Sequence, residues 1–185
     1  MARLALEVNI LGMKKPVQLH FQRFEFKYHL PVRIVPALKA DLIKNGMLLD
    51  PYVSAISGGT YPVTSLYFDN ASWGCYWDKE AGKKDRAKLR FRIYNTRLKD
   101  SDVIFLELKE KHDAVVSKKR IVVPREAYNL YNATRNITSL SPFFTGENRR
   151  DFREIAAFAE LNSLFPRLLV AYRRDPLVWE YNDRL

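Results

Sequence analysis

The stretch Arg86-Ala-Lys-Leu-Arg-Phe-Arg-Ile-Tyr94 decides the fold, because from residue 86 to residue 93 cations and apolar residues alternate. Successive side chains of a strand leave opposite faces, so the stretch predicts a strand with a core face and a cationic face. In a confined space, cations roughly 7 Å apart would repel by roughly 2 kcal/mol. Two interpretations follow: a solvated sheet face, or the wall of a cavity that binds a polyanion.

Three further stretches, residues 23–30, 101–111 and 115–123, repeat this pattern of a charged face and an apolar face. Their charged faces carry Arg23, Glu25 and Lys27; Glu107, Lys109 and Lys111; and Lys118 and Arg120. A solvated sheet face usually mixes charge signs with Ser and Thr, whereas these faces are mostly cationic. The repetition favours a concave sheet or barrel whose polar interior binds a phosphate-rich ligand.

The remaining patterns predict the elements around these strands. Residues 61–69 and 167–174 have strand composition, and apolar stripes predict helices at residues 32–45 and 147–164. Pro124 begins a short helix to residue 130, residues 70–79 form a loop with a short helix, and residues 132–146 form a loop. The fold class is α+β, with an antiparallel β-barrel or tunnel-like sheet and helices outside.

Composition narrows the partner and the compartment. A chain of 185 residues makes one domain, and its net charge of +10 predicts an anionic partner such as nucleic acid, a phosphate compound or an acidic membrane surface. Cys75 is the single cysteine, so no internal disulfide forms, which fits a reducing compartment. The apolar run at residues 4–11 is too short and too polar for a signal peptide or a membrane span. We expect a cytoplasmic protein.

Several other kinds of site are disfavoured. No glycine-rich run leads into Gly-Lys-Ser/Thr, and the three histidines lack metal-pair spacing. Cys75 fits a buried apolar position better than a nucleophile, and the helical spacing of Trp73 and Trp77 favours packing over base stacking. Nucleic acid binding on a sheet usually uses aromatics on the charged face to stack bases. Here Phe24, Phe26 and Phe91 lie on the opposite parity from the cations, which counts against that function.

An ordered set of stretches from about residue 22 to the end resembles the VTC domain, a family of the CYTH or triphosphate-tunnel superfamily, in its bacterial form. These stretches are Arg23-Phe-Glu-Phe-Lys-Tyr28, Tyr61-Pro-Val-Thr-Ser-Leu-Tyr-Phe-Asp-Asn70, Tyr76 with Lys79 and Gly82, residues 86–94, Phe105-Leu-Glu-Leu-Lys109, Lys118-Lys-Arg120 and Leu164-Phe-Pro-Arg-Leu-Leu-Val-Ala-Tyr-Arg-Arg174. The domain boundaries that follow are an N-terminal extension at 1–21 and a tunnel domain at 22–185.

The resemblance implies a tunnel that binds ATP, triphosphate or polyphosphate with a divalent metal, Mn2+ or Mg2+, and no nucleic acid or membrane partner. Carried over by motif, the phosphate contacts are Lys27, Arg90, Arg92, Lys109 and Arg174, with Lys88, Lys118 and Arg120 as helpers. Arg90, Arg92, Lys109 and Arg174 are the catalytic candidates. The motif alone does not decide which of residues 118–120 points inward. Glu25 and Glu107 either hold the metal or pair with neighbouring cations.

The resemblance also implies an activity, since in the best-understood relatives the VTC domain is a polyphosphate polymerase that transfers the γ-phosphate of ATP to a growing chain. The family continues past the strand at 167–174 with strands that carry an acidic metal ligand and a phosphate-binding lysine, and this sequence ends at Leu185. We therefore expect an incomplete tunnel wall and doubtful turnover by this chain alone. A non-catalytic polyphosphate or nucleotide-binding module and a tripolyphosphatase-type hydrolase stay open as alternatives. An open barrel edge could also mediate homo-oligomerisation.

Overall fold

The computed structural model describes residues 20–23, 28–50, 59–113 and 115–179. The chain divides into two compact units, and each is described by itself. The first comprises residues 1–24 and 63–172, and the second comprises residues 25–62 and 173–185.

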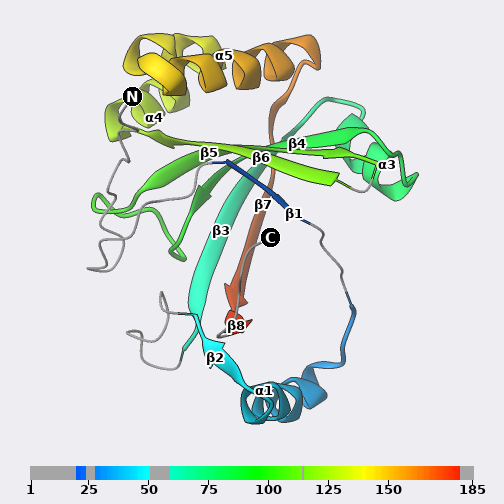
Figure 1. Cartoon of the computed structure of the whole chain (residues 1–185). Helices are drawn as coiled ribbons and strands as arrows, with labels where there is room; N and C mark the ends of the chain where they lie inside the picture. Colours follow the sequence, from blue (N-terminus) through cyan, green and yellow to red (C-terminus); the bar gives the residue numbers. More distant parts are fainter. Residues whose placement is uncertain (1–19, 24–27, 51–58, 114, 180–185) are drawn as a thin grey trace. The chain divides into compact units, whose positions relative to one another are not determined.

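A six-stranded sheet organises the first unit (Figure 1). Its order is β1 (His20–Arg23), β6 (Val115–Val123), β5 (Ile104–His112), β4 (Arg86–Ile93), β3 (Tyr61–Asp69) and β7 (Phe165–Arg174), with the ends of β3 and β7 assigned to the second unit. The pairs β1–β6, β6–β5, β5–β4 and β4–β3 are antiparallel. The α+β class is confirmed. A closed barrel is not found, because the strand order among the described residues ends at β1 and at β7.

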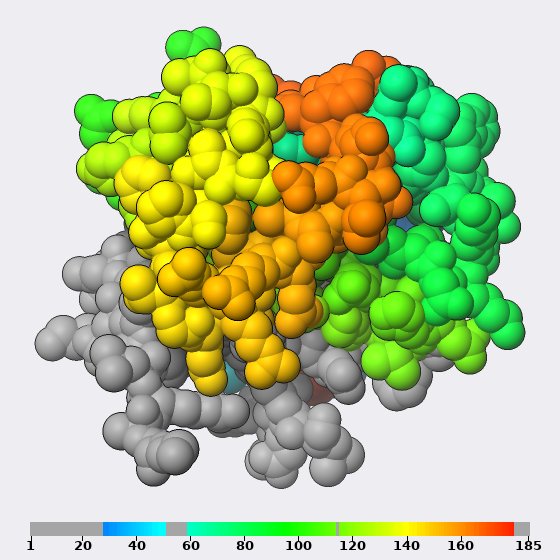
Figure 2. Space-filling view, turned by 90° about the horizontal axis from the view of Figure 1, so that it is seen from above, coloured from blue at the N-terminus to red at the C-terminus, as the bar shows by residue number. Residues whose placement is uncertain are grey.

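Helices cover one face of this sheet. Figure 1 shows α4 (Arg125–Thr134) and α5 (Gly146–Leu161) over it, with the 3-10 helix η2 (Ile137–Phe143) between them in sequence. Figure 2, seen from above, shows η2, α5 and the start of β7 as yellow and orange atoms over the centre of this face. The short helix α3 (Gly74–Glu80) directly precedes β4. The cationic side chains of the strands therefore lie on the face of the sheet that the helices do not cover.

The core lies between the sheet and the helices, and strand register builds it. Leu89 pairs with Leu108, and Phe91 pairs with Leu106, which pairs in turn with Ile121. All five side chains are at most 3% exposed. They belong to one apolar cluster with residues of the helical layer, among them Tyr131, Phe152 and Ile155. Because the side-chain period of a strand is two, the register that aligns these residues also aligns the cations on the opposite face.

The second unit holds the 3-10 helix η1 (Val32–Ile34), α1 (Val35–Lys44) and a two-stranded antiparallel sheet of β2 (Met47–Leu49) and β8 (Leu177–Trp179). The predicted helix at residues 32–45 is confirmed. Its predicted apolar stripe is not part of a core, since no residue of α1 is buried. No residue pattern predicted β2 or β8, because three residues are too few for an alternating pattern to stand out.

Two element predictions need correction. The strand predicted at residues 23–30 is wrong at residues 28–30, which are irregular; β1 covers His20–Arg23, and residues 24–27 lie outside the described part. The loop predicted at 132–146 contains η2, where Asn136 caps the helix by accepting a bond from the Thr138 amide. Within the described part of the chain, no helix is both long and apolar enough to cross a membrane.

Replacing Leu106 with alanine should lower the free energy of unfolding by about 2–5 kcal/mol, because it removes a 0% exposed side chain from the centre of the core. Urea denaturation measures the effect. Leu161→Ala is the matched control, since Leu161 is 85% exposed and its loss should change stability by less than about 0.5 kcal/mol. Equal losses in the two variants would contradict the assignment of the core.

Candidate functional site

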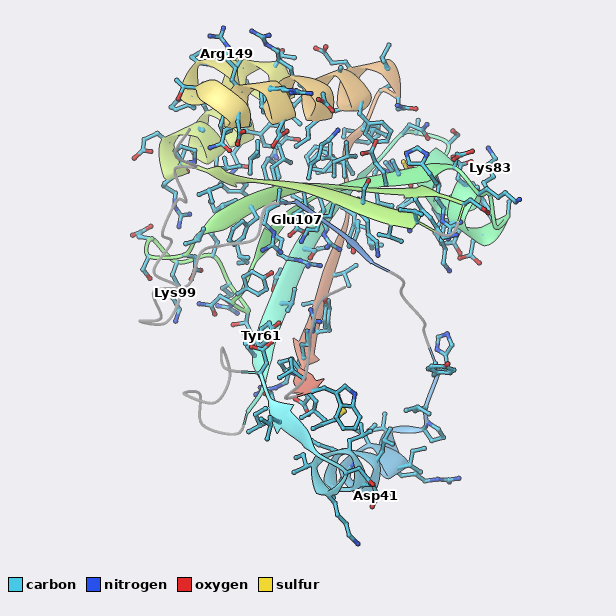
Figure 3. The ribbon with its side chains drawn as sticks, viewed as in Figure 1. Asp41, Tyr61, Lys83, Lys99, Glu107 and Arg149 are labelled. Carbon is cyan, nitrogen blue, oxygen red and sulfur yellow. The ribbon has the colours of Figure 1, made fainter. Side chains whose placement is uncertain are left out.

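The strand register sets side chains, all of them polar except Phe105, in three rows across the face opposite the helices. The middle row is Tyr67, Arg90, Glu107 and Arg120. One step toward the start of β4 comes a row that we call the lysine row, made of Lys88, Lys109 and Lys118. One step the other way lie Ser65, Arg92 and Phe105. Figure 3 labels Glu107 on this side of the sheet and Arg149 on the outer surface of α5.

Glu107 lies at the centre of a cluster of cations and is 0% exposed. Its Oε2 lies 2.6 Å from Arg90 Nη2 and 3.5 Å from Arg92 Nη1. Its Oε1 lies 2.5 Å from both Lys118 Nζ and Arg120 Nη2. We call these five residues the Glu107 cluster. With every group ionised, its four cations and one carboxylate leave an excess of three positive charges (4 − 1 = 3).

The cations keep Glu107 ionised. Burial by itself would raise the pKa of this carboxyl group. Attraction to Arg120, Arg90, Arg92 and Lys118, in that order of strength, outweighs burial and holds the pKa well below its usual value of 4.5. The carboxylate is therefore a permanent counter-ion at the middle of the basic face.

Two of the arginines are held from both sides. Arg90 donates from Nε to Glu107 Oε2 at 2.7 Å and from Nη1 to the Tyr67 hydroxyl at 2.5 Å. Arg120 donates from Nε to Glu107 Oε1 at 2.6 Å and from Nη2 to the Tyr94 hydroxyl at 2.8 Å. The Arg120 guanidinium also lies 4.6 Å from the centre of the Phe105 ring. These bonds fix both guanidinium groups, so their positive charge keeps its position when a ligand arrives.

The lysine row places like charges directly opposite one another on three adjacent strands. Such pairs are destabilising in a sheet. Lys118 is 7% exposed, and its burial, aided by repulsion from Arg120, lowers its pKa to about 7 despite attraction to Glu107. Burial also lowers the pKa of half-buried Lys88. An anion bound along this row would relieve the repulsion and favour the charged form of both lysines.

The structure places most of the predicted residues on one face. These are Lys88, Arg90, Arg92, Glu107, Lys109, Lys118 and Arg120. Among residues 118–120, Lys118 and Arg120 contact Glu107, whereas Lys119 pairs with Glu154 of the helical layer. Lys27 and Glu25 lie outside the described residues. Arg174 belongs to the second unit and is exposed, so its phosphate contact stays a prediction.

The described residues do not fit a divalent metal. Both oxygens of Glu107 are already within 3.5 Å of cations. Across the described ranges, no three His, Cys, Asp or Glu residues gather as they would around a metal ion. Of the two roles open to Glu107 from its sequence, the geometry therefore favours the pairing of cations.

Sequence reasoning missed or misplaced several residues near the site. Ser65 accepts a bond from Arg92 Nε at 3.1 Å, and its position two residues before Tyr67 on β3 could have indicated this. The packing role predicted for Trp77 is wrong, since this residue is 60% exposed.

Cys75 is half-buried. Burial, followed by repulsion from Asp69 and Asp78, raises the pKa of its thiol to about 11, which disfavours the thiolate form that a nucleophile needs.

Comparison with known proteins gives a family and a fold. A family model, the VTC domain, matches residues 22–185. No curated protein matches the sequence. A crystal structure from Bacillus halodurans, of a protein proposed to be an adenylate cyclase, is similar to this chain with a TM-score of 0.50 and 13% identity. The match covers 88% of this chain and 67% of the other, and at this identity it shows a shared fold.

Replacing Glu107 with glutamine should lower the free energy of unfolding by about 3–5 kcal/mol at pH 7, because four cations lose their common counter-ion. The folded-state pKa of Glu107 is depressed, so its contribution is complete above the usual value of 4.5 and declines as pH falls below it. Urea denaturation measures both effects. Glu110→Gln, on the other face of β5 with Lys119 at 3.9 Å, is the control and should cost less than about 1 kcal/mol. Equal costs would contradict a central role for Glu107.

The pH dependence of the free energy of unfolding should reveal the titration of Lys118. Its pKa falls from 10.5 to about 7 on folding, so the unfolded chain binds more protons between these values. The free energy of unfolding of the parent, relative to Lys118→Met, should therefore rise as pH increases from about 7 to 10.5. Lys119→Met is the control: the bond to Glu154 raises the pKa of Lys119, so the contribution of Lys119 stays constant below its usual pKa of 10.5 and declines above it. Parallel pH profiles for parent and Lys118→Met would refute the shift.

Proposed function

Because the chain belongs to the VTC domain family, we propose that it binds linear triphosphate and polyphosphate on the cationic face of its sheet. One observation carries the proposal: six cationic residues of three neighbouring strands share one face around a single carboxylate. They are Lys88, Arg90, Arg92, Lys109, Lys118 and Arg120. A solvated surface would leave such side chains exposed, yet Arg92 and Lys118 are 6% and 7% exposed.

The lysine row and Arg92 are the proposed phosphate contacts. Arg90 and Arg120 direct donor pairs at Glu107, so they supply mainly fixed positive charge. Arg92 bonds Ser65 through Nε and lies 3.5 Å from Glu107 through Nη1, so it is held less tightly. Lysine ammonium groups carry three rotatable donors and adapt to successive phosphates. A chain of phosphates would thus meet the adaptable Lys88 and Lys109, with Lys118, Arg90 and Arg120 held behind them by Glu107.

The proposed reaction transfers the γ-phosphoryl group of ATP to the terminal oxygen of a polyphosphate chain. The bond between the β–γ bridging oxygen and the γ-phosphorus breaks, a new P–O bond forms at the chain end, and the products are ADP and a chain longer by one phosphate. Phosphoryl transfer requires positioning and charge stabilisation more than covalent chemistry by the protein. On this chain, the lysine row and Arg92 would orient the phosphates and stabilise the charge on the transferred group.

A binding module without turnover is the second candidate. The cation-saturated geometry of Glu107 favours it, because no carboxylate of the described cationic face is open to a metal ion. The two candidates share the same phosphate site and differ only in whether ATP is consumed.

Calorimetric titration with tripolyphosphate in EDTA tests the shared site. The parent should bind, because the proposed contacts are protein cations, and Lys109→Met should weaken binding about 10- to 150-fold by removing one charged hydrogen-bonding group. Lys119→Met is the matched control, since Lys119 lies on the helical face of β6 and pairs with Glu154. Sulfate at equal ionic strength controls for screening.

No binding by the parent, or equal losses in the two variants, would refute the site. A second assay separates the candidates by supplying ATP, a short polyphosphate primer and Mn2+. Release of ADP with growth of the primer supports the transferase, whereas tripolyphosphate binding without ADP supports the binding module.

A further inference from the structure

An exposed aromatic pair lies on α3, and neither the core nor the proposed phosphate contacts account for it. Tyr76 is 44% exposed and Trp77 is 60% exposed. Their rings meet edge to face, with 5.1 Å between centroids. Exposing two large rings side by side forgoes their burial energy, so such a pair indicates a binding surface.

The helix that carries this pair is firmly anchored to the end of β3. Buried Asp69 accepts bonds from the Cys75 amide at 2.9 Å and from the Tyr76 amide at 3.0 Å. Asn70 Oδ1 accepts a bond from the Gly74 amide at 2.8 Å. The two aromatic rings therefore sit on a pre-organised support, which reduces the entropy lost when a ligand binds.

Trp73 adds a further anchor at the beginning of α3. This half-buried residue adopts a left-handed backbone conformation with φ of 59°, which is unusual for a bulky side chain. The Arg167 guanidinium lies 4.3 Å from the centre of its ring, which ties the start of α3 to β7. Trp73 thus does the packing that its spacing predicts, and Trp77 remains available on the surface.

The start of α3 lies level with the lysine row. Asp69, which binds the Cys75 and Tyr76 amides, is two residues past Tyr67, and Lys88 is two residues before Arg90, the partner of Tyr67. A short turn joins α3 to β4, and Lys88 is the third residue of β4. Lys79 follows Tyr76 by three positions on α3, which places both on one side of the helix. Burial lowers the pKa of Lys88, and repulsion from Lys79 adds to this shift. Lys79, whose Nζ also lies 2.5 Å from Glu80 Oε1, therefore adds a cation on the Tyr76 side of α3, next to the helix end that lies level with Lys88.

We propose that Tyr76 and Trp77 form a stacking platform for the base of a nucleoside triphosphate whose phosphates lie on the lysine row. The inference rests on the proposed function. It adds an aromatic surface that would favour a nucleotide over an inorganic phosphate chain. Base stacking on aromatic rings tolerates different bases, so ATP and GTP should bind alike. Exposed aromatics also occur at protein interfaces, but here the adjoining Lys79 and Lys88 favour an anionic ligand with a planar group.

The test compares ATP with tripolyphosphate on the same variants by calorimetry. The double variant Tyr76→Ala/Trp77→Ala should bind ATP about 5- to 150-fold more weakly than the parent and bind tripolyphosphate with unchanged affinity. The single variant Trp77→Phe should keep most of the ATP affinity of the parent, because it retains an aromatic face beside Tyr76. Phe143→Ala is the matched control, since Phe143 is 39% exposed on η2, and it should change neither affinity.

The outcomes separate the two proposals. If the parent binds neither ligand, the proposed phosphate site fails and the platform fails with it. If the double variant binds both ligands as the parent does, the platform is overturned while the phosphate site stands. If it loses both ligands equally yet unfolds at the urea concentration of the parent, α3 contacts phosphates, and the base assignment is again overturned.

A second measurement needs no variant and guards against misfolding of the double variant. With saturating ATP on the parent chain, nuclear Overhauser effects should connect the adenine H2 and H8 protons with ring protons of Trp77 and Tyr76. Their absence at saturation would overturn the platform even if the double variant had failed to fold.

Discussion

The ion pairs of Glu107 are the constraint on which the basic face depends. Four cations from β4 and β6 approach one carboxylate on β5, and all five groups lie in a region largely removed from water. Without this carboxylate, mutual repulsion and desolvation would oppose the alignment of the strands. Burial of ions is seldom a net gain in stability. The arrangement therefore suits a protein that maintains positive charge for a ligand.

The two faces of the sheet are coupled through strand register. Pairing of Phe91 with Leu106 and Ile121 aligns the core beneath the helices. The same register aligns Lys88, Lys109 and Lys118 on the other side, where residues of like charge lie opposite one another. Core packing thus holds the lysines in a row that they would not form by themselves. An anionic chain along this row would replace repulsion with attraction, which is the physical basis of the proposed binding function.

Glu107 and Trp77 show what residue patterns do not predict, namely which groups a side chain contacts in the folded protein. A glutamate among cations on a strand suits a metal site and an ion-pair cluster equally well, and only the distances to Arg90, Lys118 and Arg120 favour the cluster. The spacing of Trp73 and Trp77 predicts that both lie on one side of a helix, yet Trp73 packs against Arg167 and Trp77 is exposed. Spacing assigns residues to a side of a helix but does not say what that side contacts.

The sequence by itself determined the antiparallel sheet, the helices and the family, because period-two alternation and apolar stripes are local properties of the chain. It placed seven of the predicted site residues, from Lys88 to Arg120, on one face, since parity alone decides which side a strand residue takes. The tertiary structure decided which residues meet: the order of the strands, the four partners of Glu107, and the position of α3 beside the lysine row. These depend on register between segments far apart in the chain and on burial, and both arise only when the core packs.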